Sequence, residues 1–222
     1  ASLNVSIPSA AYAVTIDTNA PSITGISNDT GASGDFRTSD QTLIFYGKSA
    51  PHAVVEIILD STTLGTATAD GSGNWSFDYT GTSLSSGSHI LTVHAGASPD
   101  DSRTIVIDTS APLLTSTTPL DNAAAVAVSS NMTMTFNENI MAGSGNLIIS
   151  NGAGDTRTID INDSTQISIS GNTLTIDPTY LLLKNMGYYI QLAAGVIKDN
   201  AGNNYAGISD TTSYNFTTAN TS

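Results

Sequence analysis

The sequence of 222 residues has no cysteine and few basic side chains. Without cysteine, disulfide bonds, thiolate metal sites and cysteine nucleophiles are excluded. Only 6 basic side chains stand against 19 acidic ones, and the formal net charge of -13 disfavours binding to nucleic acid. No apolar run approaches the roughly 20 residues of a membrane-spanning helix, and the first eight residues lack the features of a signal peptide. We therefore expect an internal segment with no nucleic-acid partner and no direct membrane insertion.

The acidic residues are almost all aspartate, and hydroxyl residues are abundant. The only glutamates are Glu56 and Glu138, and Ser and Thr together supply 60 residues. Asp favours turns and caps, whereas Glu favours helices. Ser and Thr suit strands and turns better than helix interiors. The composition therefore predicts an all-β protein.

A short internal repeat divides the chain. Residues 14–21 (VTIDTNAP) are echoed by residues 106–112 (VIDTSAP), with Asp17 and Asp108 91 positions apart. In each copy a β-branched run ends at Asp, and an Ala-Pro pair then blocks further strand pairing. The spacing matches one immunoglobulin-sized unit. We expect the last strand or linker of a preceding module at 1–17, one domain at 18–108, a second at 109–218 and a linker at 219–222.

Both domains consist of β-forming runs separated by turn signals, which is the pattern of a β-sandwich. The first domain is expected to have strands at 22–26, 42–46, 54–59, 64–69, 75–79, 89–95 and 103–107. The second is expected to have strands at 114–117, 132–136, 146–150, 156–161, 166–170, 173–176, 188–192 and 213–217. Gly171-Asn172 predicts a tight hairpin, and residues 180–184 predict one helical turn. The predicted fold class is all-β, with two tandem immunoglobulin-like β-sandwich domains.

Several motifs resemble a known family. Residues 26–40 (ISNDTGASGDFRTSD), residues 65–75 (GTATADGSGNW) and the two IDTxAP joints resemble bacterial immunoglobulin-like repeats, the extender modules of large calcium-dependent adhesins of the repeats-in-toxin (RTX) type. Residues 113–218, which include FNE and KDNAGN, look like the related module of bacterial surface-layer and adhesin proteins. The resemblance implies an extracellular segment at the bacterial cell surface that acts in attachment or biofilm formation.

For a metal, the sequence offers oxygen ligands and little else. Calcium takes six to eight such ligands. Because successive loops of a sandwich alternate between its ends, the acids of residues 28–40 should lie at the downstream end of the first domain, beside Asp108. The loops that carry Glu138 and Asp199 should lie at the upstream end of the second domain, also beside Asp108. The predicted calcium ligands at this joint are Asp29, Asp35, Asp40, Asp108, Glu138, Asp199 and Asn203.

A second ion is predicted at the upstream joint, around Asp17, with Asp70 or Asp100 nearby. The alternative for all these loop acids is a structural one, because loop Asp residues commonly cap backbone amides of their own turns.

No catalytic residue is predicted, and we expect the protein not to be an enzyme. His89 and His94 are five positions apart on one expected strand and therefore face opposite sides. The sequence contains no Gly-x-Ser-x-Gly nucleophile elbow.

The predicted function is mechanical: a monomeric spacer segment that is rigidified by calcium at its joint, has neighbouring Ig-like modules of the same chain as partners, and holds a distal binding domain away from the cell. Two alternatives stay open. One is a ligand-binding adhesin region that uses aromatic side chains to contact glycan or protein. The other is an accessory module of a secreted polysaccharide hydrolase.

Overall fold

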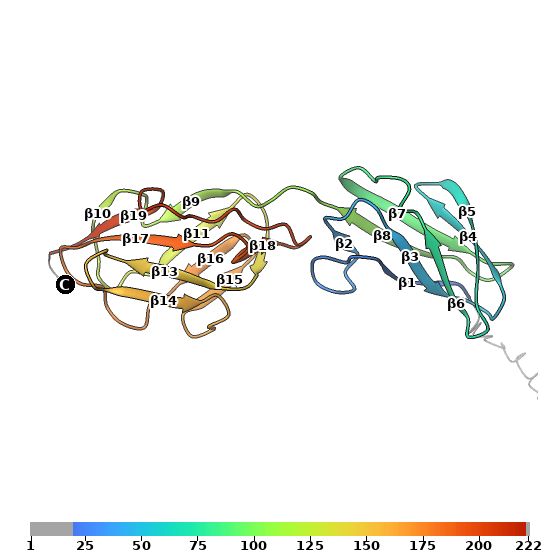
Figure 1. The fold of residues 1–222 in the computed structure, drawn as a ribbon, viewed down its shortest axis with the longest axis horizontal. Helices are drawn as coiled ribbons and strands as arrows, with labels where there is room; N and C mark the ends of the chain where they lie inside the picture. The colour runs from blue at the N-terminus through green and yellow to red at the C-terminus, as the bar shows by residue number, and fades with distance from the viewer. Residues whose placement is uncertain (1–19, 221–222) are drawn as a thin grey trace, which may run out of the picture.

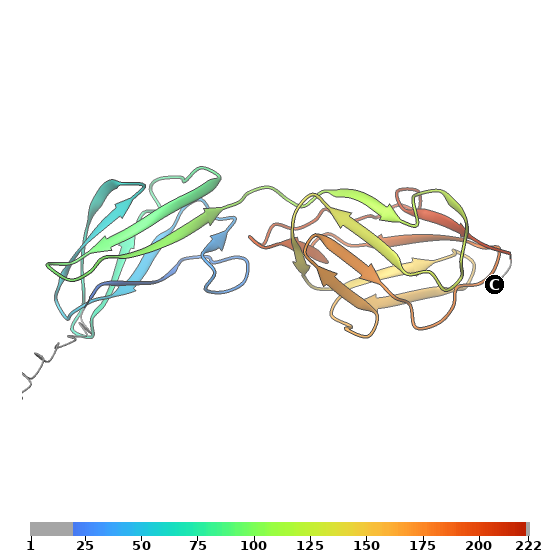
Figure 2. The same ribbon diagram turned by 180° about the vertical axis from the view of Figure 1, so that it is seen from behind.

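The computed structural model describes residues 20–220, which form two β-sandwiches placed end to end (Figure 1). Figure 2 shows the same arrangement from behind, with the strands of each sandwich running along the long axis of the molecule. The described residues contain strands and no helix, so none of them forms a helix that would span a membrane. The predicted all-β fold with two tandem sandwiches is therefore confirmed. The segment expected at 1–17 lies outside the described residues.

The first sandwich packs a three-stranded sheet against a five-stranded sheet. The smaller sheet has the order β1 (Ser22–Ile26), β3 (Ile44–Lys48), β6 (Asn74–Asp78). The larger sheet has the order β2 (Arg37–Thr38), β8 (Asp101–Ile107), β7 (Gly87–His94), β4 (Val54–Leu59), β5 (Thr62–Thr68). Alternate residues of β4 are buried, as the two-residue period of a strand requires. Trp75 is 3% exposed and lies in the core between the sheets.

The second sandwich is built in the same way with one longer sheet. Its first sheet has the order β15 (Ile167–Ser170), β16 (Thr173–Ile176), β11 (Met132–Phe136), β9 (Leu114–Thr118). Its second sheet has the order β10 (Ala123–Val126), β19 (Asn215–Thr218), β17 (Gly187–Leu192), β13 (Asn146–Ser150), β14 (Thr156–Asp160). A separate two-stranded sheet joins β12 (Ile140–Ala142) to β18 (Ile197–Asp199). The predicted hairpin at Gly171-Asn172 connects β15 and β16.

The two sandwiches share one topology. In each, the second strand pairs in parallel with the last, as β2 does with β8 and β10 does with β19. The strands β1 to β8 correspond in order to β9, β10, β11, β13, β14, β16, β17 and β19. The loops after β3 and after β11 therefore occupy equivalent places at the upstream ends of their sandwiches. The loops after β7 and after β17 are equivalent in the same sense.

The structure departs from the sequence-based expectation in two respects. The short strands β2, β10, β12 and β18 were not expected, because two to four residues carry too little local signal and take their extended form from the strands that they pair with. The helical turn predicted at 180–184 was wrong, because this segment is irregular. The guanidinium of Arg157 donates hydrogen bonds to the carbonyls of Tyr180 and Leu181, and the amide of Leu182 donates to Val128 across the sandwich.

A partly exposed pair of His89 and Asp60 predicts how the stability of the first sandwich varies with pH. His89 Nδ1 lies 2.7 Å from Asp60 Oδ2, and its Nε2 lies 2.9 Å from the carbonyl of Ser85. Burial lowers the pKa of His89, but these two hydrogen bonds outweigh it and raise the pKa above 6.5. Because the charged ring is favoured in the folded state, its stabilisation is fully present below pH 6.5 and is lost as the pH rises through the raised pKa.

We therefore expect the melting midpoint of the first sandwich to fall by about 2 °C as the pH rises from 6 to 8. Fluorescence of Trp75, the only tryptophan of the chain, reports this transition alone. His89→Gln should remove most of the dependence. His94→Gln should remove less, since its pairing with Asp100 is more exposed to solvent. An unchanged pH dependence in His89→Gln would contradict the assignment.

Candidate metal centre between the two sandwiches

Asp108 lies where the first sandwich ends and is held by both domains. Its backbone amide donates to the carbonyl of Thr38 at 3.0 Å, which continues the pairing of β8 with β2. Its carboxylate accepts a hydrogen bond from the amide of Ser110 at 3.0 Å. On the other side, Asn203 Nδ2 of the second sandwich donates to the carbonyl of Asp108 at 2.8 Å. Asp108 is therefore part of a direct link between the domains.

Asp199 ends β18 and is fully buried. One carboxylate oxygen accepts the backbone amides of Ala201 and Asn203 at 2.8 Å each, and the other accepts Asn203 Nδ2 at 2.7 Å. Pairing of Asp199 with Ile140 fixes the start of this loop against β12. The loop that follows β18 is thus wrapped around a buried negative charge, which normally requires a compensating partner.

Glu138 lies in the loop between β11 and β12 and completes a group of three carboxylates. One ligand oxygen each from Asp108, Glu138 and Asp199 lies within 4.8 Å of the others. Burial raises the pKa of Glu138, and the negative charges of Asp199 and Asp108 raise it further. In the described part of the chain, neither a hydrogen-bond donor nor a basic ion-pair partner contacts the Glu138 carboxylate. Among the described residues, none therefore compensates this charge.

The donors of this group suit a hard divalent cation. All are oxygens, and three carboxylates that bind in one- or two-oxygen modes supply three to six of the six to eight ligands of calcium. Each carboxylate oxygen has two lone pairs, so Asp199 can accept its amide hydrogen bonds and still face an ion. Backbone carbonyls and water are the usual remaining ligands. Asn203, predicted as a ligand, orients both Asp199 and the carbonyl of Asp108.

The other acids predicted for this joint have structural partners in their own loop. Asp35 accepts the amide of Arg37 at 2.9 Å. Asp40 accepts the amide of Thr42, and although burial alone would raise its pKa, hydrogen bonds from Asn28 and Thr42 lower it. These acids do not belong to the group of three carboxylates.

Asp29 differs from its neighbours in the same loop. One of its oxygens accepts the amide of Gly34 at 2.7 Å, and the other, Oδ1, is buried with no hydrogen-bond partner among the described residues. A buried carboxylate oxygen without a donor is costly, and a cation would satisfy it. Of the three loop acids, Asp29 therefore fits the prediction of a metal ligand best.

A contact between the two sandwiches was not anticipated from the sequence. Thr30 Oγ1 donates a hydrogen bond to the carbonyl of Ala201 across the joint. A Cβ on Gly31 would lie 1.8 Å from the carbonyl oxygen of Asn200, and one on Gly202 would lie 2.3 Å from that of Thr30. Only glycine permits backbones to approach this closely. Both glycines were visible in the resembling motifs, but no local pattern indicates that they meet.

The acids predicted for the upstream joint do not belong to the group of three carboxylates. Asp17 lies outside the described residues. Asp70 caps its own turn by accepting the amides of Ser72 and Asn74, and Asp100 pairs with His94 at 2.6 Å. The ligand-binding alternative needs exposed aromatic side chains, but Tyr188, Tyr205 and Tyr214 are buried in the core of the second sandwich.

Family models match both halves of the chain. One model, described as a bacterial Ig-like domain, matches residues 108–218, and a second model with the same description matches residues 14–109. Neither model describes a catalytic family. Among curated proteins no sequence matches the chain.

Solved structures with a similar arrangement are distant in sequence and shape. A tetra-tandem repeat in the extending region of a large adhesion protein is 17% identical, with a TM-score of 0.33, 89% of this chain covered and 48% of that one. A structure from a 1.5-MDa bacterial ice-binding adhesin is 15% identical, with a TM-score of 0.33 and coverages of 89% and 62%. The BSP domain of a biofilm-associated protein is 15% identical, with a TM-score of 0.26 and coverages of 83% and 28%. This chain spans less than two thirds of each of these three chains.

The cluster of three carboxylates predicts that one substitution, Glu138→Gln, has opposite effects on the melting temperature of the second sandwich without and with calcium. In EGTA, Glu138→Gln should raise the melting temperature of the second sandwich by about 2 °C, because it removes like-charge repulsion. In about 10 mM CaCl₂ the wild type should gain roughly 10 °C, as expected for a site with Kd on the order of 10⁻⁴ M, and the variant should gain much less. Differential scanning calorimetry in the two buffers measures both effects.

Glu56→Gln is the matched control, because Glu56 is the only other glutamate and lies in β4, hydrogen-bonded to Thr63. Its response to calcium should equal that of the wild type. If Glu138→Gln and the wild type gain equally from calcium, Glu138 is not a ligand.

Proposed function

The chain belongs to the bacterial Ig-like domain family in both of its halves, and we propose that it is a spacer segment of a bacterial cell-surface adhesin whose central joint is stiffened by calcium. The observation that carries this proposal is the meeting of Asp108, Glu138 and Asp199 where the two sandwiches join. In this role the segment transmits force and sets distance, and a distal domain of the intact protein makes the adhesive contact.

The shape of the molecule supports a spacer. The two sandwiches follow each other lengthwise, with a linker of a few residues between β8 and β9 (Figure 1). Force applied at the two ends of such a chain passes through the joint. The stiffness of the joint therefore decides whether the two domains behave as one rigid rod or move independently. The three carboxylates of Asp108, Glu138 and Asp199 lie at this joint.

Calcium would act on the joint by linking groups from both sandwiches. Asp108 is anchored to β2 of the first sandwich, whereas Glu138 and Asp199 belong to the second. Without a cation their charges repel and favour separation of the domains. A bound ion reverses the sign of this interaction and fixes the angle between the domains.

The affinity expected for such a site restricts where it works. Extracellular calcium modules bind with a Kd on the order of 10⁻⁴ to 10⁻³ M. Millimolar calcium outside the cell would fill the site, and submicromolar calcium in the cytosol would leave the joint free. The segment would therefore become rigid only after export to the cell surface.

Small-angle X-ray scattering in CaCl₂ and in EGTA tests this function. We expect a longer and narrower envelope in calcium for the wild type and no such change for Asp108→Asn. Asp177→Asn, a substitution of an acid away from the group, should behave as the wild type. Equal scattering of the wild type in both buffers would rule out the calcium-stiffened spacer, and a glycan array would then test the ligand-binding alternative.

The close approach of Gly31 to Asn200 yields a separate prediction. Gly31→Ala should prevent the two loops from meeting, because its Cβ has no room against a backbone carbonyl. In calcium the variant should scatter as a more flexible particle, with the melting of the first sandwich shifted by less than about 1 °C, because the clash lies outside its core.

Gly81→Ala is the control for this prediction. Gly81 lies in an exposed loop of the same sandwich, and a Cβ there meets nothing within 4 Å. Its scattering should match the wild type. A Gly31→Ala protein as extended and rigid as the wild type would show that the contact is not required for the joint.

A further inference from the structure

A hollow of about 390 Å³ lies on the outer face of the second sandwich, over strands β17 and β19. Tyr188 and Phe216 point into the core, so the residues next to them on each strand point outward. The outward residues that line the hollow are Gly187 and Tyr189 on β17 and Asn215 and Thr217 on β19. Since Gly187 has no side chain, the sheet is bare at this point and the side chains around it form the walls.

One wall of the hollow comes from the loop at residues 209–213, which is held on the outer face of the sheet. Gln191 Nε2 on β17 donates to the carbonyl of Ser209 at 2.6 Å. The Asp210 carboxylate accepts the backbone amides of Thr212 and Ser213 at 2.7 Å each, which closes the turn of this loop. The wall therefore has a fixed shape before any ligand binds.

The opposite wall is formed by two asparagine side chains that Asp121 holds in place. Asp121 Oδ1 accepts the backbone amide and the side-chain amide of Asn215 at 3.0 Å each. Its Oδ2 accepts Asn122 Nδ2 at 2.7 Å. The side-chain carbonyl of Asn215 accepts no hydrogen bond from any described residue. It is therefore a fixed acceptor for a donor that enters the hollow.

The lining combines an aromatic ring with neutral polar groups. The hydroxyls of Tyr189, Thr211 and Thr217 have no hydrogen-bond partner among residues 20–220. None of the described residues that line the hollow is charged. The hollow therefore suits a neutral ligand that has several hydroxyl groups and one apolar face.

We propose that this hollow binds a neutral pyranose ring of a glycan. The C–H bonds on one face of such a ring would pack against Tyr189, and its hydroxyls would bond to Asn215 and to the threonine hydroxyls of the walls. An aromatic surface with a few fixed polar groups is the usual composition of a small-ligand site. Acidic sugars are disfavoured, because the described lining offers no cation and the chain carries a net charge of -13.

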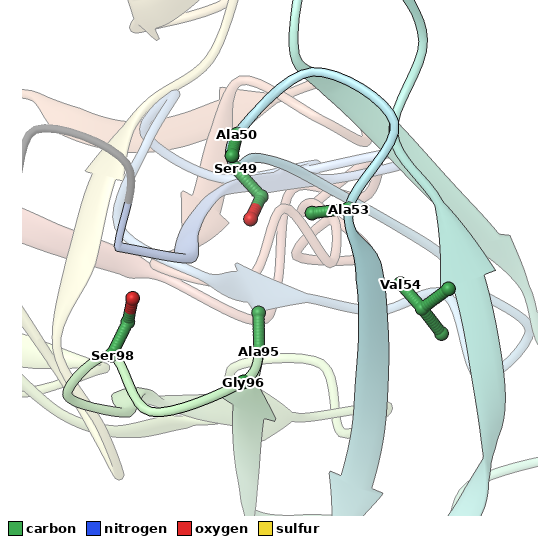
Figure 3. A pocket seen from close by; sticks show the side chains of 7 residues that line it. All are labelled: Ser49, Ala50, Ala53, Val54, Ala95, Gly96 and Ser98. Atoms are coloured by element: carbon green, nitrogen blue, oxygen red, sulfur yellow. The ribbon is translucent and has the colours of Figure 1, made fainter.

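The hollow at the upstream end of the first sandwich does not suit this ligand. It lies between the loops after β3 and after β7 and has a volume of about 580 Å³. Figure 3 shows the side chains of Ser49 and Ser98 on opposite sides of this space, with Ala50, Ala53 and Ala95 beside them. Its described walls carry neither an aromatic ring nor a side-chain amide. A sugar would therefore find a stacking surface in the hollow over β17 and β19 and none in the described walls of this one.

The inference goes beyond the proposed function, because a spacer that carries this site would also contact carbohydrate along its side. None of the three carboxylates of the joint lines the hollow. Glycan binding should therefore be equal in CaCl₂ and in EGTA. Failure of calcium to change the scattering of the wild type would count against the spacer proposal and leave the glycan site standing.

A glycan array of neutral and sialylated glycans, probed with the full chain in EGTA, tests the inference. The wild type should bind neutral glycans, and isothermal titration calorimetry then measures the affinity for the best of them. Gly187→Leu should weaken binding about tenfold by filling the hollow, and Tyr189→Ala should weaken it as much by removing the stacking surface. Tyr189→Phe keeps the ring and should retain most of the affinity. A Cβ at Gly187 meets nothing within 4 Å, so Gly187→Leu should melt within about 2 °C of the wild type.

Gly81→Leu and Tyr180→Ala are the matched controls. A Cβ at Gly81 also meets nothing within 4 Å, and Tyr180 is 77% exposed but does not line the hollow. Both variants should bind as the wild type does. Three results would each overturn the proposal: no binding to any neutral glycan, a preference for sialylated glycans, or an unchanged affinity in both Gly187→Leu and Tyr189→Ala.

Discussion

Like-charge repulsion among the carboxylates of Asp108, Glu138 and Asp199 is the constraint on which the joint between the sandwiches depends. Asp199 is fully buried and holds its loop through three hydrogen bonds, so it cannot move away without loss of the loop. Asp108 is fixed by the pairing of β8 with β2. Burial and the negative charges of Asp199 and Asp108 raise the pKa of Glu138. Under the proposed function, the angle between the two domains would depend on whether a cation occupies this point.

The upstream ends of the two sandwiches show how one topology can present different loop side chains. The strand order that brings Glu138 and Asp199 together also brings Ser49 and Ser98 to either side of a hollow. The difference lies in the side chains of two loops and not in the sheets.

Much of this organisation could be predicted from the sequence, because it follows from periodic patterns. The strand of Met132 and Phe136 alternates buried and partly exposed residues, and loop parity correctly placed Glu138 and Asp199 at one end of the second sandwich. The short strands β2 and β18 could not be predicted, since their extended form comes from pairing with distant partners. The close approach of Gly31 to Asn200 could not be predicted either, because a contact between two loops produces no periodic pattern in the sequence.

The distance between the two sandwiches, measured by pulsed electron paramagnetic resonance, tests most directly whether a cation fixes the joint. Because the chain has no cysteine, Thr66→Cys on β5 and Thr158→Cys on β14 give one spin label on an exposed position of each domain. If a cation fixes the joint, the distance distribution should be narrow in millimolar calcium and broad in EGTA. Distributions of equal width in the two buffers would contradict the claim that a cation at the carboxylate group fixes the joint.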